Sequence, residues 1–91
     1  MFKCKVEKNG IIEDVHFEYF EDFEDYPLFN DLVYIDISTT PKSKEKFTEM
    51  PFELPPKLKT LKINHHKITS LPNFPEPLQF FSAIKQQPFF N

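Results

Sequence analysis

Residues 58–78 read LKTLKINHHKITSLPNFPEPL, and the apolar positions of this stretch decide the fold. Leu58 and Leu61 begin a short run in which apolar and polar residues alternate, and an extended segment ending in prolines follows it. Leu78 and Phe81 repeat the first two positions twenty residues later. A fixed period of this length indicates a fold built from similar units, each of which buries its apolar face against its neighbours.

The same pattern continues towards the N-terminus. Leu32, Ile35 and Ile37 have the spacing of the first three apolar positions of the stretch above. Downstream of them, FTEMP at residues 47–51 matches ITSLP at residues 68–72. Each unit should therefore contribute one short strand whose apolar side chains alternate with outward-facing polar ones.

The combined pattern LxxLxLxxNxLxxLPxxPxxL resembles the leucine-rich repeat family, in particular its short LPxLP class, which occurs in bacterial effectors and in proteins of large DNA viruses. The resemblance covers residues 23–88 and is closest from Leu54 to Pro77. It implies a mainly β, short leucine-rich-repeat solenoid with parallel strands, formed by about three units over residues 28–91. It also implies a non-enzymatic protein-protein interaction module.

The chain departs from this family at two kinds of position. Where the family usually has an asparagine that hydrogen-bonds the turn backbone, this chain has Thr40, His66 and Gln86, and we expect His66 to bond the turn instead. The last unit carries Phe81 and Ala83 at leucine positions, and we expect it to lack a polar capping segment. An apolar C-terminal edge is therefore expected, formed by Phe81, Phe89 and Phe90.

An N-terminal β-hairpin is expected before the repeats. Residues 2–8 alternate apolar and charged side chains, and Asn9-Gly10 is the pair that a two-residue hairpin turn prefers. With that turn, residues 2–8 face residues 11–17, one face is mostly apolar, and the other pairs lysines with acidic or histidine side chains. We expect this hairpin to cap the solenoid.

The next segment, EYFEDFEDY at residues 18–26, has aromatic residues at roughly helical spacing, and Pro27 ends any helix there. We expect a short helix or turn whose aromatic side chains belong to the core, with a partner-binding stripe as the alternative. Residues 1–27 thus form an N-terminal hairpin and acidic aromatic cap. The aromatic residues concerned are Tyr19, Phe20, Phe23 and Tyr26.

The outward-facing residues of the strands are the predicted partner-binding surface. Aligning the units places them in columns across a concave sheet, and exposed aromatic residues supply contact area at low entropic cost. Tyr34 and Phe80 are the expected main contacts, while Asp36 and Lys62 could instead pair across strands. An unused face is the alternative. The candidate partner-binding residues are Tyr34, Asp36, Thr60, Lys62, Asn64 and Phe80.

Composition excludes several classes of function. The net charge is -3 and there is no arginine, which argues against nucleic-acid recognition. One glycine cannot build the loops that cradle nucleotide phosphates, and one cysteine allows no internal disulfide. Without an apolar run of membrane-spanning length, we expect no membrane association and an intracellular location, in the cytoplasm or in a virus particle.

Two other classes of function compete with the interaction module. The apolar C-terminal edge suggests a small structural subunit of a larger assembly, such as a minor virion (capsid) component or a homo-oligomer, whose partner is a copy of itself. A metal-dependent enzyme would need His65, His66, His16, Cys4 or the acidic residues to form a site, but they lack a recognised ligand spacing. We therefore expect no enzyme activity, no metal and no cofactor, and a buried structural Cys4.

Overall fold

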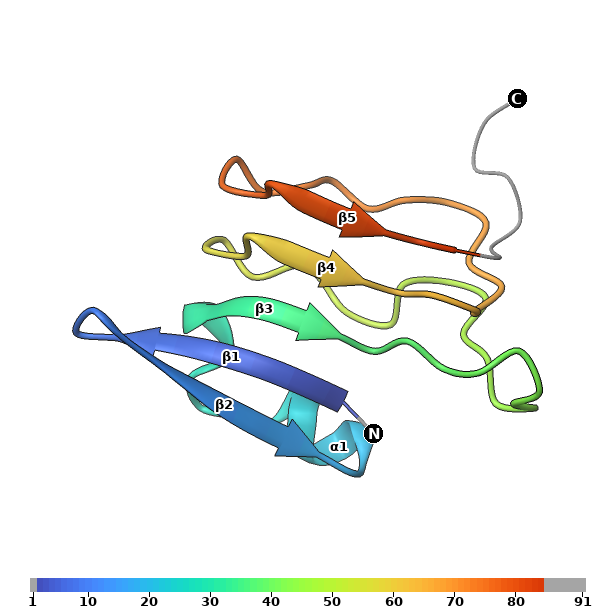
Figure 1. Ribbon diagram of the computed structural model, residues 1–91, viewed down its shortest axis with the longest axis horizontal. Helices are drawn as coiled ribbons and strands as arrows, with labels where there is room; N and C mark the ends of the chain where they lie inside the picture. The colour runs from blue at the N-terminus through green and yellow to red at the C-terminus, as the bar shows by residue number, and fades with distance from the viewer. Residues whose placement is uncertain (1, 85–91) are drawn as a thin grey trace.

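The computed structural model describes residues 2–84 and is mainly β, with one open, mixed sheet of five strands in the order β2-β1-β3-β4-β5 (Figure 1). Within those residues no helix is long and apolar enough to cross a bilayer. Gln86, Phe89 and Phe90 lie outside the described part of the chain. The elements are β1 (Phe2–Lys8), β2 (Ile11–Phe17), α1 (Phe20–Glu24), the 3-10 helix η1 (Phe29–Asp31), β3 (Leu32–Asp36), β4 (Thr60–Lys62) and β5 (Phe80–Ser82).

The expected N-terminal hairpin is confirmed in its register. Phe2 lies opposite Phe17 and Lys8 opposite Ile11 in the antiparallel β1–β2 pair. Asn9 and Gly10 both have positive φ, at 54° and 78°, as a type I′ turn requires. This turn geometry fixes which side chains of the two strands share a face.

The sheet is parallel in only one of its halves. Strands β3, β4 and β5 pair in parallel, as the repeats predicted. On the other side of β3, strand β1 pairs with it in an antiparallel direction, with an irregularity between Lys5 and Val6. The prediction of parallel strands is thus only partly correct, because the hairpin does not sit across an end of the parallel strands but extends the same sheet edge to edge.

The core lies on one face of this sheet and becomes less buried towards β5. Leu58, Leu61 and Ile63 are fully buried, whereas Leu78 and Phe81, at the equivalent positions of the last unit, are only partly buried. Apolar residues of the segment between β3 and β4 pack against the core from behind the strands. The buried core residues are Cys4, Val6, Phe23, Leu32, Ile35, Ile37, Leu58, Leu61, Ile63 and Ile68.

Helix α1 supplies the aromatic centre of the hairpin half. Phe23 has no exposed surface, and the rings of the hairpin, the helix and the following segments surround it. Phe20 and Tyr26 are partly buried and pack against the core, as expected. Tyr19 is 66% exposed, so its assignment to the core is wrong, because it precedes the helix in an extended conformation at the end of the hairpin.

Candidate functional site

The outward residues of the parallel strands form the predicted rows. Tyr34 lies beside Thr60, and Thr60 beside Phe80. The next row places Asp36 beside Lys62, and Lys62 beside Ser82. These rows lie on the face of the sheet opposite the core, since the alternate positions between them are buried or partly buried.

Strand β1 of the hairpin adds two lysines to these rows. The sequence alone did not predict that they would lie there. Lys5 lies opposite Tyr34 and Lys3 opposite Asp36 across the β1–β3 pair. Their alternation within residues 2–8 was visible in the sequence, but the pairing of β1 with β3 was not. We name the surface formed by Lys5, Tyr34, Lys62 and Phe80 the sheet face.

Tyr34 is the centre of the sheet face. The ammonium groups of Lys5 and Lys62 lie 5.2 and 5.4 Å from the centroid of its ring, within the range of cation–π attraction. Lys62 also lies 5.8 Å from the ring centroid of Phe80, which is 53% exposed. Two aromatic rings and two cations thus form one continuous patch.

The alternative pairing of Asp36 with Lys62 is not found. Within the described residues the two side chains form no ion pair, and Lys62 lies over aromatic rings instead. Asp36 Oδ1 accepts a hydrogen bond of 2.9 Å from the backbone N–H of Ser38. The ammonium group of Lys62 therefore interacts with the rings of Tyr34 and Phe80 and not with the Asp36 carboxylate.

Asn64 has a different position from the other candidate contacts. Its Oδ1 accepts hydrogen bonds from Ser82 Oγ at 2.8 Å and from the Ile84 N–H at 2.7 Å. Its own N–H donates to Ser38 Oγ at 2.9 Å. Asn64 thus joins the ends of three neighbouring strands, and this use of its amide oxygen stabilises the sheet.

His66 is buried, with 4% of its surface exposed, and does hydrogen-bond the backbone, but not at its own turn. Its Nδ1 accepts from the Phe47 N–H at 3.0 Å, which leaves the ring proton on Nε2 to donate to the Ile37 carbonyl oxygen at 2.5 Å. Both partners belong to the preceding unit. The imidazole therefore links two units. The hydrogen bond expected from the asparagine position would have joined the side chain to the turn of its own unit.

Burial lowers the pKa of His66 from its ordinary value of 6.5, and the charges of Lys46 and His65 lower it further, although the hydrogen bond to Ile37 acts in the opposite direction. The unfolded chain then binds a proton at His66 more readily than the folded one. Stability contributed by the neutral ring is full above pH 6.5 and falls as the pH drops below that value. We expect the urea midpoint to decrease between neutral pH and about pH 5.5, less so in His66→Gln. Equal decreases in both proteins would contradict this.

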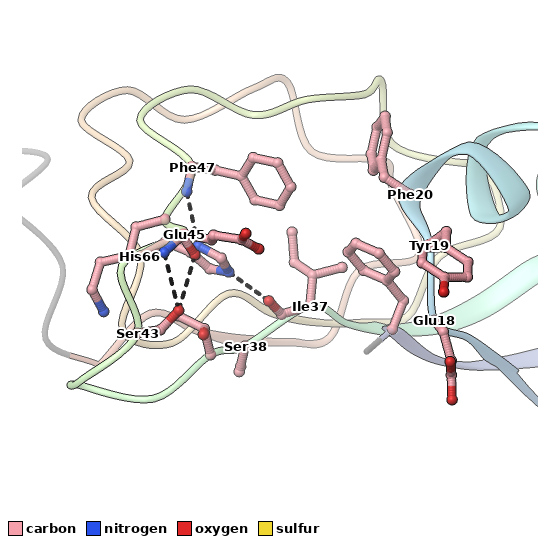
Figure 2. Close-up of a pocket in the computed structure, with 12 residues that line it drawn as sticks. Glu18, Tyr19, Phe20, Ile37, Ser38, Ser43, Glu45, Phe47 and His66 are labelled. Carbon is pink, nitrogen blue, oxygen red and sulfur yellow. Dashed lines mark hydrogen bonds between the residues drawn. The ribbon is translucent and has the colours of Figure 1, made fainter.

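A pocket of about 580 Å³ lies where β3 ends (Figure 2). Its walls come from Phe2, from residues 18–20 and 37–39, from Ser43 and residues 45–47, and from His66. These segments are far apart in the sequence. They meet because β1 and β3 are neighbours and because the polar insertion PKSKEK, residues 41–46, folds back towards the hairpin. No site was expected in this insertion from the sequence.

Lys46 is the one lysine in the pocket wall, and its ammonium group is already engaged. Its Nζ donates to the Thr40 carbonyl oxygen at 2.8 Å and to the His65 carbonyl oxygen at 2.5 Å. His65 has a positive φ of 69°, so its carbonyl is presented by a left-handed turn after β4. Lys46 thus closes the insertion onto that turn.

The residues considered for catalysis do not assemble. Burial, and secondarily the charge of Asp36, raise the pKa of Cys4 to about 12, so its thiol stays protonated. Both ring nitrogens of His66 are engaged by backbone groups. Over residues 2–84, no three His, Cys, Asp or Glu side chains are grouped to hold a metal ion. The expected burial of Cys4 is confirmed, with 2% of its surface exposed.

Comparison of the chain with protein-family models, with curated proteins and with solved structures gives no match in any of the three.

Proposed function

We propose that this chain is a non-enzymatic protein-protein interaction module of the leucine-rich-repeat type, which binds a partner protein on its sheet face. The observation that carries the proposal is the row that joins Tyr34, Thr60 and Phe80 across the three parallel strands. An aromatic residue at each end of the row, with a lysine over both rings, is the kind of surface on which a partner gains contact area.

The repeat character of the module is supported by its backbone hydrogen bonds. Ile37 N–H bonds the carbonyl of Lys62 at 3.0 Å, and Ile63 N–H bonds that of Ser82 at 2.8 Å. The same equivalence holds two residues later, where the Thr39 N–H donates to the Asn64 carbonyl at 3.0 Å. Successive units thus contact each other through equivalent groups, which is how a short solenoid would stack.

The sheet face can bind a partner without first rearranging. Tyr34 is already positioned by the two lysines, and Phe80 exposes half of its surface. Aromatic side chains have few rotatable bonds, so ordering them at an interface costs little entropy. The lysines would add hydrogen bonds and favour a partner with acidic or carbonyl groups at the rim of the contact.

The double variant Tyr34→Ala, Phe80→Ala is expected to weaken binding of the partner by at least about tenfold, because each ring should contribute more than about 1 kcal/mol at the centre of an interface. The partner would be captured from the native source, and its dissociation constant measured by calorimetry. Ile11→Ala is the matched control, since Ile11 is 63% exposed and lies away from the sheet face. Unchanged binding by the double variant would reject this face.

A second candidate function is a structural subunit that associates with copies of itself through the β5 end. Phe74 is 43% exposed and Ile84 57%, and the ring of Phe74 contacts that of the partly buried Phe81 in a tilted arrangement, with 5.1 Å between centroids. Another chain could cover this apolar group. Light scattering would show a mass that rises with concentration and that Phe74→Ser reduces, whereas a constant monomer mass would exclude this candidate.

A further inference from the structure

The pocket at the end of β3 combines apolar walls with unpaired negative charge. Phe20 and Phe47 are partly buried, their ring centroids are 6.0 Å apart, and both line the space. Figure 2 shows the carboxylate of Glu45 pointing towards the middle of the labelled side chains, whereas that of Glu18 points away from them. A ligand that enters the pocket and packs against these two rings would therefore meet one inward-facing carboxylate.

The charges around this space favour a cation. Within residues 2–84 neither Glu18 nor Glu45 forms an ion pair. Lys46 uses its ammonium group on two backbone carbonyls, and the lowered pKa of His66 keeps that ring neutral at pH 7. Lys44, beside Glu45, is exposed and does not line the pocket. Lys46 keeps its positive charge in these hydrogen bonds, but the carboxylates of Glu18 and Glu45 outnumber it, so the net charge of the pocket lining is negative.

We propose that this pocket binds a basic side chain, lysine or arginine, of a partner protein. The methylene stem would pack against the pocket-facing sides of the contacting Phe20 and Phe47 rings, and the cation would lie against the Glu45 carboxylate. Aromatic faces attract cations as well as apolar stems, so both parts of such a side chain have matching walls. The proposal deepens the proposed function, on which it rests, because it gives the chemistry of one partner residue.

The position of the pocket indicates a polypeptide ligand. Ser38 lines the pocket, and it follows Asp36 of the sheet rows by two residues. Asn64 N–H bonds the Ser38 hydroxyl, so the pocket wall is joined to the last row of the sheet. A partner chain lying across the sheet face along β3 would reach the pocket without leaving the surface.

The test uses the whole chain and two small probes with the same four-carbon stem, N-acetyl-lysine methylamide and the uncharged N-acetyl-norleucine methylamide, which lacks the ammonium group. Amide chemical shifts, followed by two-dimensional NMR at low salt, should change on addition of the lysine probe at Ser38, Glu45 and Phe47, and should change little with the norleucine probe. Glu45→Gln should weaken the lysine probe by about threefold to fivefold, the range of a half-exposed ion pair. Glu49→Gln is the matched control, because Glu49 is an exposed glutamate outside the pocket.

Equal binding of both probes, shifts confined to other residues, or an unchanged affinity in Glu45→Gln would each overturn the proposal. The Tyr34→Ala, Phe80→Ala variant should bind the lysine probe as the natural chain does, because neither side chain lines the pocket. If the sheet face is not the binding surface, the double variant will bind the partner normally, and the lysine probe will still bind the pocket. If only the pocket proposal is wrong, the lysine probe will give a negative result, and the double variant will still lose the partner.

Discussion

Replacing Phe23 with alanine is expected to lower the free energy of unfolding by about 3–5 kcal/mol. Its side chain has no exposed surface, and five rings lie with centroids between 4.9 and 6.0 Å from its own. A chain of 91 residues has a total stability of roughly 5–10 kcal/mol, so the variant should be close to unfolding. The rings around Phe23 are those of Phe2, Phe17, Phe20, Phe29 and Phe52.

Urea unfolding followed by circular dichroism measures this loss. Phe80→Ala is the control, because the ring removed is the same but 53% exposed, and its cost should stay below about 1 kcal/mol. If the two variants lost equal stability, Phe23 would not be the centre of the hairpin half. A change in the slope of the transition would instead indicate that the unfolded state had changed.

Replacing His66 with phenylalanine should cost about 2–4 kcal/mol, because the ring volume is kept while two backbone groups lose their partner. These groups are the Phe47 N–H and the Ile37 carbonyl. The imidazole is 4% exposed, so water cannot easily replace it. The loss should be measured above pH 6.5, where the folded and unfolded chains both hold the ring neutral.

His66→Gln is the matched comparison, because its amide carries one acceptor and one donor, as the neutral imidazole does. We expect it to retain part of the stability that His66→Phe loses. Equal stability of the phenylalanine variant and the natural chain would show that the two hydrogen bonds are dispensable. The insertion and the following turn would then be held by Lys46 and by packing alone.

The hairpin and the parallel pairing of β3, β4 and β5 could be predicted because local signals were strong. The Asn9-Gly10 turn fixes a hairpin register, and the positive φ of both residues in the structure explains why that pair was informative. The twenty-residue spacing placed Thr60 and Phe80 in one row, the matching apolar spacing around Tyr34 added that residue, and the parallel pairings agree with this row. Alternation and period act through neighbouring positions, so one sequence is enough to reveal them.

The other features of the fold and of the candidate site could not be predicted, because they depend on contacts between segments that are distant in the sequence. Pairing of the hairpin with β3 brought Lys5 beside Tyr34, and nothing in residues 2–8 specifies that neighbour. His66 was expected at its own turn, but an imidazole reaches farther than an asparagine amide and bonds the preceding unit. The pocket forms only where the insertion, the end of the hairpin and the end of β3 come together. Tyr19 was misassigned because helical spacing alone does not show where a helix begins.

The central claim is that the sheet face is the surface that meets a partner. Site-specific photocrosslinking tests it most directly, with a photoreactive residue placed at position 34, 80 or 11 of the whole chain in an extract of its native source. We predict the same crosslinked partner from positions 34 and 80, suppressed by an excess of the natural chain, and none from position 11. Crosslinking from position 11 alone, or none from positions 34 and 80, would contradict the proposed function.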